Sequence, residues 1–107
     1  MSAPIRVLVT AVGGDLGQAL VKALRISGIP VECHGCDSDS SGIGSAFVGK
    51  LHVVPAADDP AYVEVLDKLC TRLGIKAVLP ATEQEIEVLS NLADPPMLPC
   101  GVPVICQ

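Results

Sequence analysis

A glycine-rich turn near the N-terminus is the first pattern in the sequence with chemical meaning. Residues 10–17 read TAVGGDLG and follow a short apolar run. Gly13 and Gly14 permit positive φ and close approach to the backbone, and Gly17 allows a helix to pack tightly on the preceding strand. Asp37 follows a second apolar run, twenty residues beyond Gly17. Such spacing is typical of turns that hold the pyrophosphate of a dinucleotide.

The match to that pattern is incomplete. Val12 stands where G-x-G-x-x-G has its first glycine, and Ala11 stands where the T-G-x-x-G-x-x-G turn of short-chain dehydrogenases has one. Asp15, at the expected start of the helix, would repel a pyrophosphate. The Tyr-x-x-x-Lys pair of those dehydrogenases is missing, because the only tyrosine, Tyr62, is followed four residues later by Leu66. NAD(P) binding therefore stays as an alternative beside a structural turn or a site for a small polar ligand.

Three glutamates follow a later apolar run at 77–79. Thr82 and Glu85 fit the S/T-x-x-E capping box, so Glu85 is expected to cap a helix, and Glu87 is expected on its solvated face. Glu83 is freer to face the edge of the sheet. There it could bind an amine or help to organise a substrate pocket.

Cysteine and histidine residues suggest no further chemistry. Cys33 and Cys36 have C-x-x-C spacing but lie in a predicted strand, where side chains alternate between faces. Their sulfurs should therefore share neither a metal ion nor a disulfide. His34 and His52 match no hydrolytic motif, so no catalytic residue and no metal ligand is assigned.

These residues must be positioned by alternating strands and helices. Short β-branched runs alternate with amphipathic stretches, which is typical of a parallel sheet flanked by helices. The expected strands are residues 5–10, 31–36, 51–54, 77–79 and 102–106. The expected helices begin at Asp15, Asp59 and Thr82; the first has Leu16 on its inner face and ends at Gly28, and the second ends at Gly74. The fold class is therefore α/β: a three-layer Rossmann-like domain with a five-stranded parallel sheet, whose ligands bind at the carboxyl ends of the strands.

Composition limits the partners. The 107 residues carry a net charge of −5 and are 50% hydrophobic, which suits one domain over residues 1–107. The acidic balance and the lack of a basic run argue against nucleic acid and anionic membrane. No apolar run approaches the roughly 20 residues that span a bilayer, and no signal peptide is visible, so a cytoplasmic protein is expected. A domain this small and hydrophobic is expected to pack on a partner or to self-associate.

Several features in order resemble a known family. They are VLVT followed by AVGGDLGQALVKAL, the end-of-strand Asp37, A-x-x-x-K-L-H-V-V-P at 46–55, DDPAY at 58–62 and AVLPATEQE at 77–85. The chain resembles the N-terminal, pre-ATP-grasp domain of ATP-grasp ligases, and is similar to the branch of the carbamoyl phosphate synthetase large subunit. The resemblance implies an enzyme that uses ATP and Mg²⁺ to form an acylphosphate and captures it with a nucleophile, usually an amine.

The resemblance also implies a division of labour. This domain would form one side of the substrate site. The nucleotide and metal ions would be bound by downstream ATP-grasp domains, either in the same protein or in a separate subunit of a split protein. The chain alone would then bind no cofactor and have no ligase activity. The resemblance assigns substrate-side roles to Gly13, Gly14, Thr82, Glu83 and Glu85, with Asp37 at the same edge and residues 38–44 forming a rim.

Overall fold

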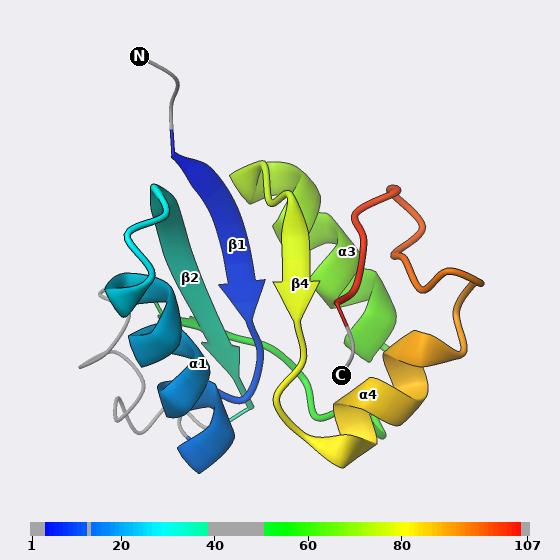
Figure 1. Cartoon of the computed structure of the whole chain (residues 1–107). Helices are drawn as coiled ribbons and strands as arrows, with labels where there is room; N and C mark the ends of the chain where they lie inside the picture. Colours follow the sequence, from blue (N-terminus) through cyan, green and yellow to red (C-terminus); the bar gives the residue numbers. More distant parts are fainter. Residues whose placement is uncertain (1–3, 13, 39–50, 106–107) are drawn as a thin grey trace.

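The central element is a parallel β-sheet. The computed structural model describes residues 4–12, 14–38 and 51–105. Within them the sheet has the order β3-β2-β1-β4, and every pair of neighbouring strands is parallel. The strands are β1 (Ile5–Val9), β2 (Val31–Asp37), β3 (Leu51–Val53) and β4 (Ala77–Leu79). The predicted α/β class with a parallel sheet is confirmed (Figure 1).

The fifth predicted strand is reduced to a single bridge. Val104 pairs in parallel with Val78 beside β4, through hydrogen bonds from Val78 N to Pro103 O and from Ile105 N to Val78 O. Pro103 has no N–H to donate, which limits extension of the ladder. A five-strand count is therefore not confirmed for the described residues.

Three helices of the described residues cover the sheet: α1 (Asp15–Ile26), α3 (Tyr62–Leu73) and α4 (Glu83–Ser90). Adjacent residues of β1 point to opposite faces, as a pleated strand requires. Val9 packs with Val21 of α1, whereas Leu8 packs with Leu66 of α3. The helices α1 and α3 therefore lie on opposite faces, which makes three layers (Figure 1).

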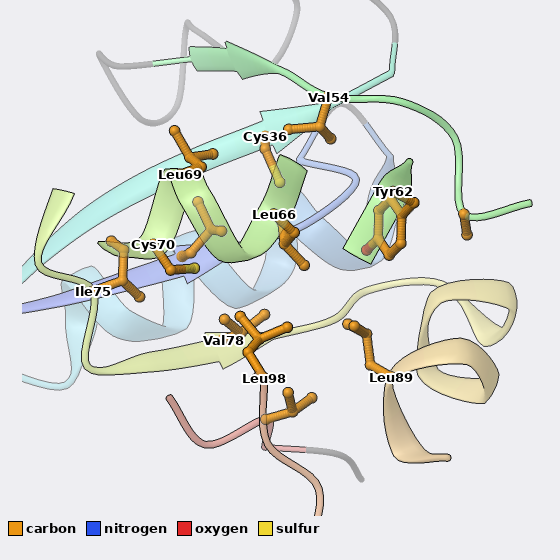
Figure 2. Close-up of a cluster of buried hydrophobic side chains, with 13 residues drawn as sticks. Cys36, Val54, Tyr62, Leu66, Leu69, Cys70, Ile75, Val78, Leu89 and Leu98 are labelled. Carbon is orange, nitrogen blue, oxygen red and sulfur yellow. The ribbon is translucent and has the colours of Figure 1, made fainter. Parts of the chain in front are cut away.

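The larger core lies on the α3 face. Tyr62, Leu66 and Leu69 of α3 pack there with Val78 of β4 and Leu89 of α4 (Figure 2). Cys36 belongs to this cluster, while Cys33 packs against the smaller cluster on the α1 face. The predicted separation of these two cysteines by strand alternation is confirmed.

The start of α1 differs from the sequence prediction. Its N-cap is Gly14, with no side-chain hydrogen bond, so Asp15 is the first helical residue rather than the cap. The buried positions are Gly17 and Val21, while the predicted inward residue Leu16 is half-exposed. The face of α1 that packs on the sheet is therefore the one with Gly17, because Gly17 has no side chain and can lie against the turn after β1. The predicted end is confirmed, since Gly28 has φ +75°.

Of the other two helices, α3 begins two residues later than predicted, whereas α4 begins where the sequence predicts. The N-cap of α3 is Ala61, and the predicted cap Asp59 instead accepts a hydrogen bond from Ala61 N, 2.8 Å away, in the preceding turn. In α4 the predicted cap is confirmed, because Thr82 Oγ1 accepts from Glu85 N. Within the described residues no helix is long and apolar enough to cross a membrane.

Candidate functional site at the carboxyl edge of the sheet

The strand order places a crevice at the carboxyl ends of β1 and β4. From β1 the chain crosses over α1 to β2 on one side, whereas β4 lies on the other side. Ligands of open parallel sheets bind at such a point of reversal. The arrowheads of β1 and β4 point toward the first turns of α1 and α4 (Figure 1). Thr10 joins the two strand ends, because its N–H donates to Leu79 O and its Oγ1 accepts from Ala81 N at 3.0 Å.

A buried carboxylate lies directly behind this edge. The side chain of Glu85 is on the first turn of α4, and the residue is 8% exposed. Its Oε1 accepts from Thr10 Oγ1 at 3.0 Å and from Thr82 Oγ1 at 3.1 Å. Its Oε2 accepts from the Tyr62 hydroxyl at 2.5 Å. Three hydroxyls thus satisfy both oxygens, and Glu85 ties together the end of β1 and the starts of α3 and α4.

Ionisable groups around Glu85 are held in their neutral forms. Burial, and next the neighbouring Glu85 carboxylate, raise the pKa of Tyr62 far above its ordinary value, so the hydroxyl remains a hydrogen-bond donor. Burial, followed by the nearby Cys100 and Asp67, raises the pKa of Cys70 to about 12. Burial also raises the pKa of Cys36. These thiols are not poised as nucleophiles, which require the thiolate.

The raised pKa values predict a loss of stability in alkali. The Tyr62 hydroxyl and Cys70 thiol ionise near pH 10 and 9 when unfolded but at higher pH when folded. Their contribution to stability is therefore fully present below pH 9 and decreases as the pH rises through 9 to 12. We expect the thermal midpoint to fall steadily from pH 8.5 to 11. The decrease should be smaller in Tyr62→Phe, and an equal decrease in that variant would contradict the assignment.

The edge brings together most of the residues singled out in the sequence. Asp37 ends β2, Gly14 caps α1, and Thr82 with Glu83 begins α4. Glu83 is exposed and makes no hydrogen bond or ion pair within the described residues. Glu85 also lies here, but its side chain faces inward and accepts hydrogen bonds from three hydroxyls. Gly13 and residues 39–44 of the predicted rim lie outside the described residues.

Sequence reasoning missed two partners in this network. Thr10 and Tyr62 are buried, and both donate to Glu85. The available signal was a hydroxyl at the end of an otherwise apolar strand, together with the only tyrosine in the chain. Among residues 4–12, 14–38 and 51–105, no three His, Cys, Asp or Glu side chains gather in a way that could hold a metal ion.

Comparison with known families defines the class of this protein. The model of the PylC-like N-terminal domain matches residues 7–105, and the chain belongs to that family. PylC, after which the family is named, is an ATP-grasp ligase, which agrees with the pre-ATP-grasp resemblance of the sequence. No curated protein matches the chain.

Solved structures with a TM-score of 0.50 or more show the fold that this chain shares. A dTDP-glucose 4,6-dehydratase from Bacillus anthracis in complex with NAD superposes with a TM-score of 0.53 at 14% identity, covering 79% of this chain and 29% of that one. CurK enoyl reductase gives a TM-score of 0.50 at 22% identity, with coverages of 82% and 27%. A short-chain dehydrogenase/reductase superfamily protein from Agrobacterium tumefaciens with bound NAD is 31% identical, with a TM-score of 0.45 and coverages of 72% and 20%. The chain spans less than a third of each of these proteins.

Proposed function

We propose that this chain is the substrate-side N-terminal domain of an ATP-dependent ligase of the ATP-grasp superfamily, which joins a carboxylate to an amine or thiol. The observation that carries the proposal is membership of the PylC-like N-terminal domain family over residues 7–105. Within that superfamily we propose that the chain is similar to the branch of the carbamoyl phosphate synthetase large subunit. The order in which its motifs follow one another in the sequence supports this assignment.

The charges at the carboxyl edge support a substrate-side role. Both helices that begin there have acidic residues in the first turn: Asp15 in α1, and Glu83 and Glu85 in α4. A helix N-terminus attracts anions, but a carboxylate already placed there repels a phosphate. The exposed Glu83 carboxylate instead suits a cationic amino group. We infer that the edge receives the amine-bearing end of a substrate.

Several of the described basic residues are poorly placed for a nucleotide at this edge. ATP-grasp chemistry must neutralise a triphosphate with Mg²⁺ and with Lys or Arg side chains. Arg6 lies at the opposite end of β1 from the crevice, Lys76 precedes β4, and Arg25 and Arg72 are in the last turns of α1 and α3. These residues do not fit a nucleotide at the carboxyl edge. In the proposal, ATP and Mg²⁺ are held by ATP-grasp domains of the same or a second chain.

An apolar surface is available for those partner domains. The groove between α1 and α4 is lined by Leu16, Leu20, Leu79, Pro80, Ile86 and Ile105. Leu16 and Ile105 are each about half-exposed. We propose that the ATP-grasp domains dock on this groove, and that the isolated chain self-associates through it. The proposed location is the cytoplasm.

Ligase assays test this function directly. We expect ATP with Mg²⁺ to cause no thermal shift in the 107-residue chain. When the ATP-grasp domains are supplied, carboxylate-dependent release of ADP should appear. Glu83→Gln should then reduce kcat/KM for the amine about tenfold or more, whereas Glu87→Gln, exposed on the same helix, should leave it unchanged. ATP turnover by the isolated chain, free of contaminating ATPase, would overturn the proposal.

A dinucleotide-binding protein of the short-chain dehydrogenase type is the second candidate. It is favoured by the fold shared with the NAD-bound dehydratase. Calorimetric titration with NADH and NADPH separates the two functions. We expect no binding, and micromolar affinity for either cofactor would favour the second candidate.

A further inference from the structure

A second groove lies away from the carboxyl edge, between β3 and α3. Its cavity volume of about 520 Å³ falls within the range of small-molecule sites. Five of the lining residues are apolar: Leu51, Val53, Val54, Val65 and Leu69. Three side chains that can carry positive charge complete it, namely His52, Lys68 and Arg72. The groove thus combines apolar residues with cations, and no acidic residue lines it among residues 4–12, 14–38 and 51–105.

The two α3 cations lie on one face of the helix. Lys68 and Arg72 are four residues apart, a spacing that places side chains side by side. Lys68 also forms an exposed ion pair with Glu64 at 3.0 Å. Arg72 forms no hydrogen bond or ion pair within the described residues. Its guanidinium can bind a carboxylate through two parallel hydrogen bonds. In a chain of net charge −5, this gathering of cations favours an anionic occupant.

The third cationic group, His52, is connected to a chain of polar side chains in which His34 is buried. His34 is 3% exposed, and its Nδ1 lies 3.5 Å from Nε2 of His52. On its other side, Nε2 of His34 lies 2.6 Å from Glu32 Oε2, which also accepts from Arg6 Nε at 3.0 Å. The chain runs across β1, β2 and β3 on the face that α3 covers. Glu32 fixes the His34 ring, and His34 in turn orients His52.

Hydrogen bonding within the histidine pair depends on which ring nitrogens carry hydrogen. When Nε2 of His34 donates to Glu32, its Nδ1 is left to accept from Nε2 of His52 across 3.5 Å. The other charged groups around the pair are Arg6 and Glu32 on the sheet and Lys68, Arg72 and Glu64 on α3, with the Cys36 thiol opposite His52 in the strand register.

We propose that the groove between β3 and α3 binds a small organic acid, with its carboxylate at Arg72 and His52 and its apolar body against the lining of Val65 and Leu69. The carboxylate of the acid stabilises positive charge at His52, because opposite charges close together favour the charged form. The acid should therefore bind more tightly at pH 6 than at pH 8, the range in which histidine ordinarily changes charge.

Nuclear magnetic resonance on the 107-residue chain tests this site, since His34 and His52 are its only histidines. Octanoate is the probe. We expect saturable shifts of both imidazole signals, with affinity about tenfold weaker in Arg72→Gln, the loss of one charge-assisted interaction. Arg25→Gln, which removes the same charge from α1 on the other face of the sheet, should bind like the wild type.

Measuring octanoate binding at two pH values separates the contribution of His52 from the attraction of the other cations. Octanoate should bind several-fold more tightly at pH 6 than at pH 8, and His52→Gln should abolish that difference while circular dichroism shows an intact fold. Inorganic phosphate, which lacks an apolar body, should bind far more weakly. Absence of saturable shifts, equal affinity for phosphate, or an unchanged affinity in Arg72→Gln would each overturn the proposal.

Discussion

Replacing Gly17 by alanine is expected to destabilise the protein by about 3 kcal/mol, at the upper end of the usual cost of overpacking. A Cβ at this position would lie 2.5 Å from Ala11 O and 2.8 Å from the Cα of Val12. Both are backbone atoms, which cannot rotate away as a side chain would. Ala11 already has φ +47°, a conformation that non-glycine residues rarely adopt, so the turn has little freedom to yield. The helix α1 would have to move away from β1.

Gly14→Ala is the matched control for this prediction. A Cβ there would lie 3.4 Å from the same oxygen, Ala11 O, and the φ of Gly14 is −88°. We expect a change within about 1 kcal/mol, the scale of helix propensity. Thermal denaturation should place the Gly17→Ala midpoint about 10–20 °C below that of the wild type. Equal midpoints for the two variants would show that the close contact of Gly17 does not limit the packing of α1.

The second large effect is expected at Glu85. Glu85→Ala removes the acceptor of the Tyr62 and Thr10 hydroxyls, both of which are buried, and leaves a cavity among them. Unsatisfied buried donors cost about 1–3 kcal/mol each, so a total loss of about 3–4 kcal/mol is expected. Glu85→Gln keeps the shape and loses the charge, and its cost should be about 1–2 kcal/mol, because the hydroxyl hydrogens can rotate to suit the amide.

Urea denaturation with a constant m-value measures these differences. Glu87→Ala is the control, because this glutamate is exposed two residues further along α4. Its effect should stay within about 0.5 kcal/mol. If Glu85→Ala were no more destabilising than Glu87→Ala, the hydroxyl network would not hold the strand ends together. Tyr62→Phe combined with Glu85→Gln should cost less than the sum of the two single changes, since both disrupt one hydrogen bond.

Local sequence patterns predicted the elements of the fold well. The apolar runs became the parallel strands β1 to β4, and Gly28 and Gly74 end α1 and α3 in the left-handed conformation. The Thr82 cap is also where the sequence places it. Each of these features depends on backbone preference or on contacts within a few residues, so neighbouring residues are sufficient to predict it.

Predictions that depended on long-range packing were less accurate. The inward stripe of α1 was expected to include Leu16, but the close fit of Gly17 against the turn after β1 rotates the helix and leaves Leu16 half-exposed. The last strand was expected over residues 102–106, but its pairing rests on contacts with Val78 and is limited by Pro103. The packing partner, rather than the local periodicity, decided both outcomes.

The sequence by itself determined the α/β class, the close packing of Gly17 and the gathering of Asp37, Thr82 and Glu83 at one edge, because parallel strands bring their carboxyl ends to the same side. Only the tertiary structure decided which side chains form the buried hydrogen-bond network around Glu85. Thr10 and Glu85 are 75 residues apart in sequence, and their side chains meet because β1 and β4 are neighbours in the sheet. Crossover connections place distant residues in contact, and a local pattern does not contain that information.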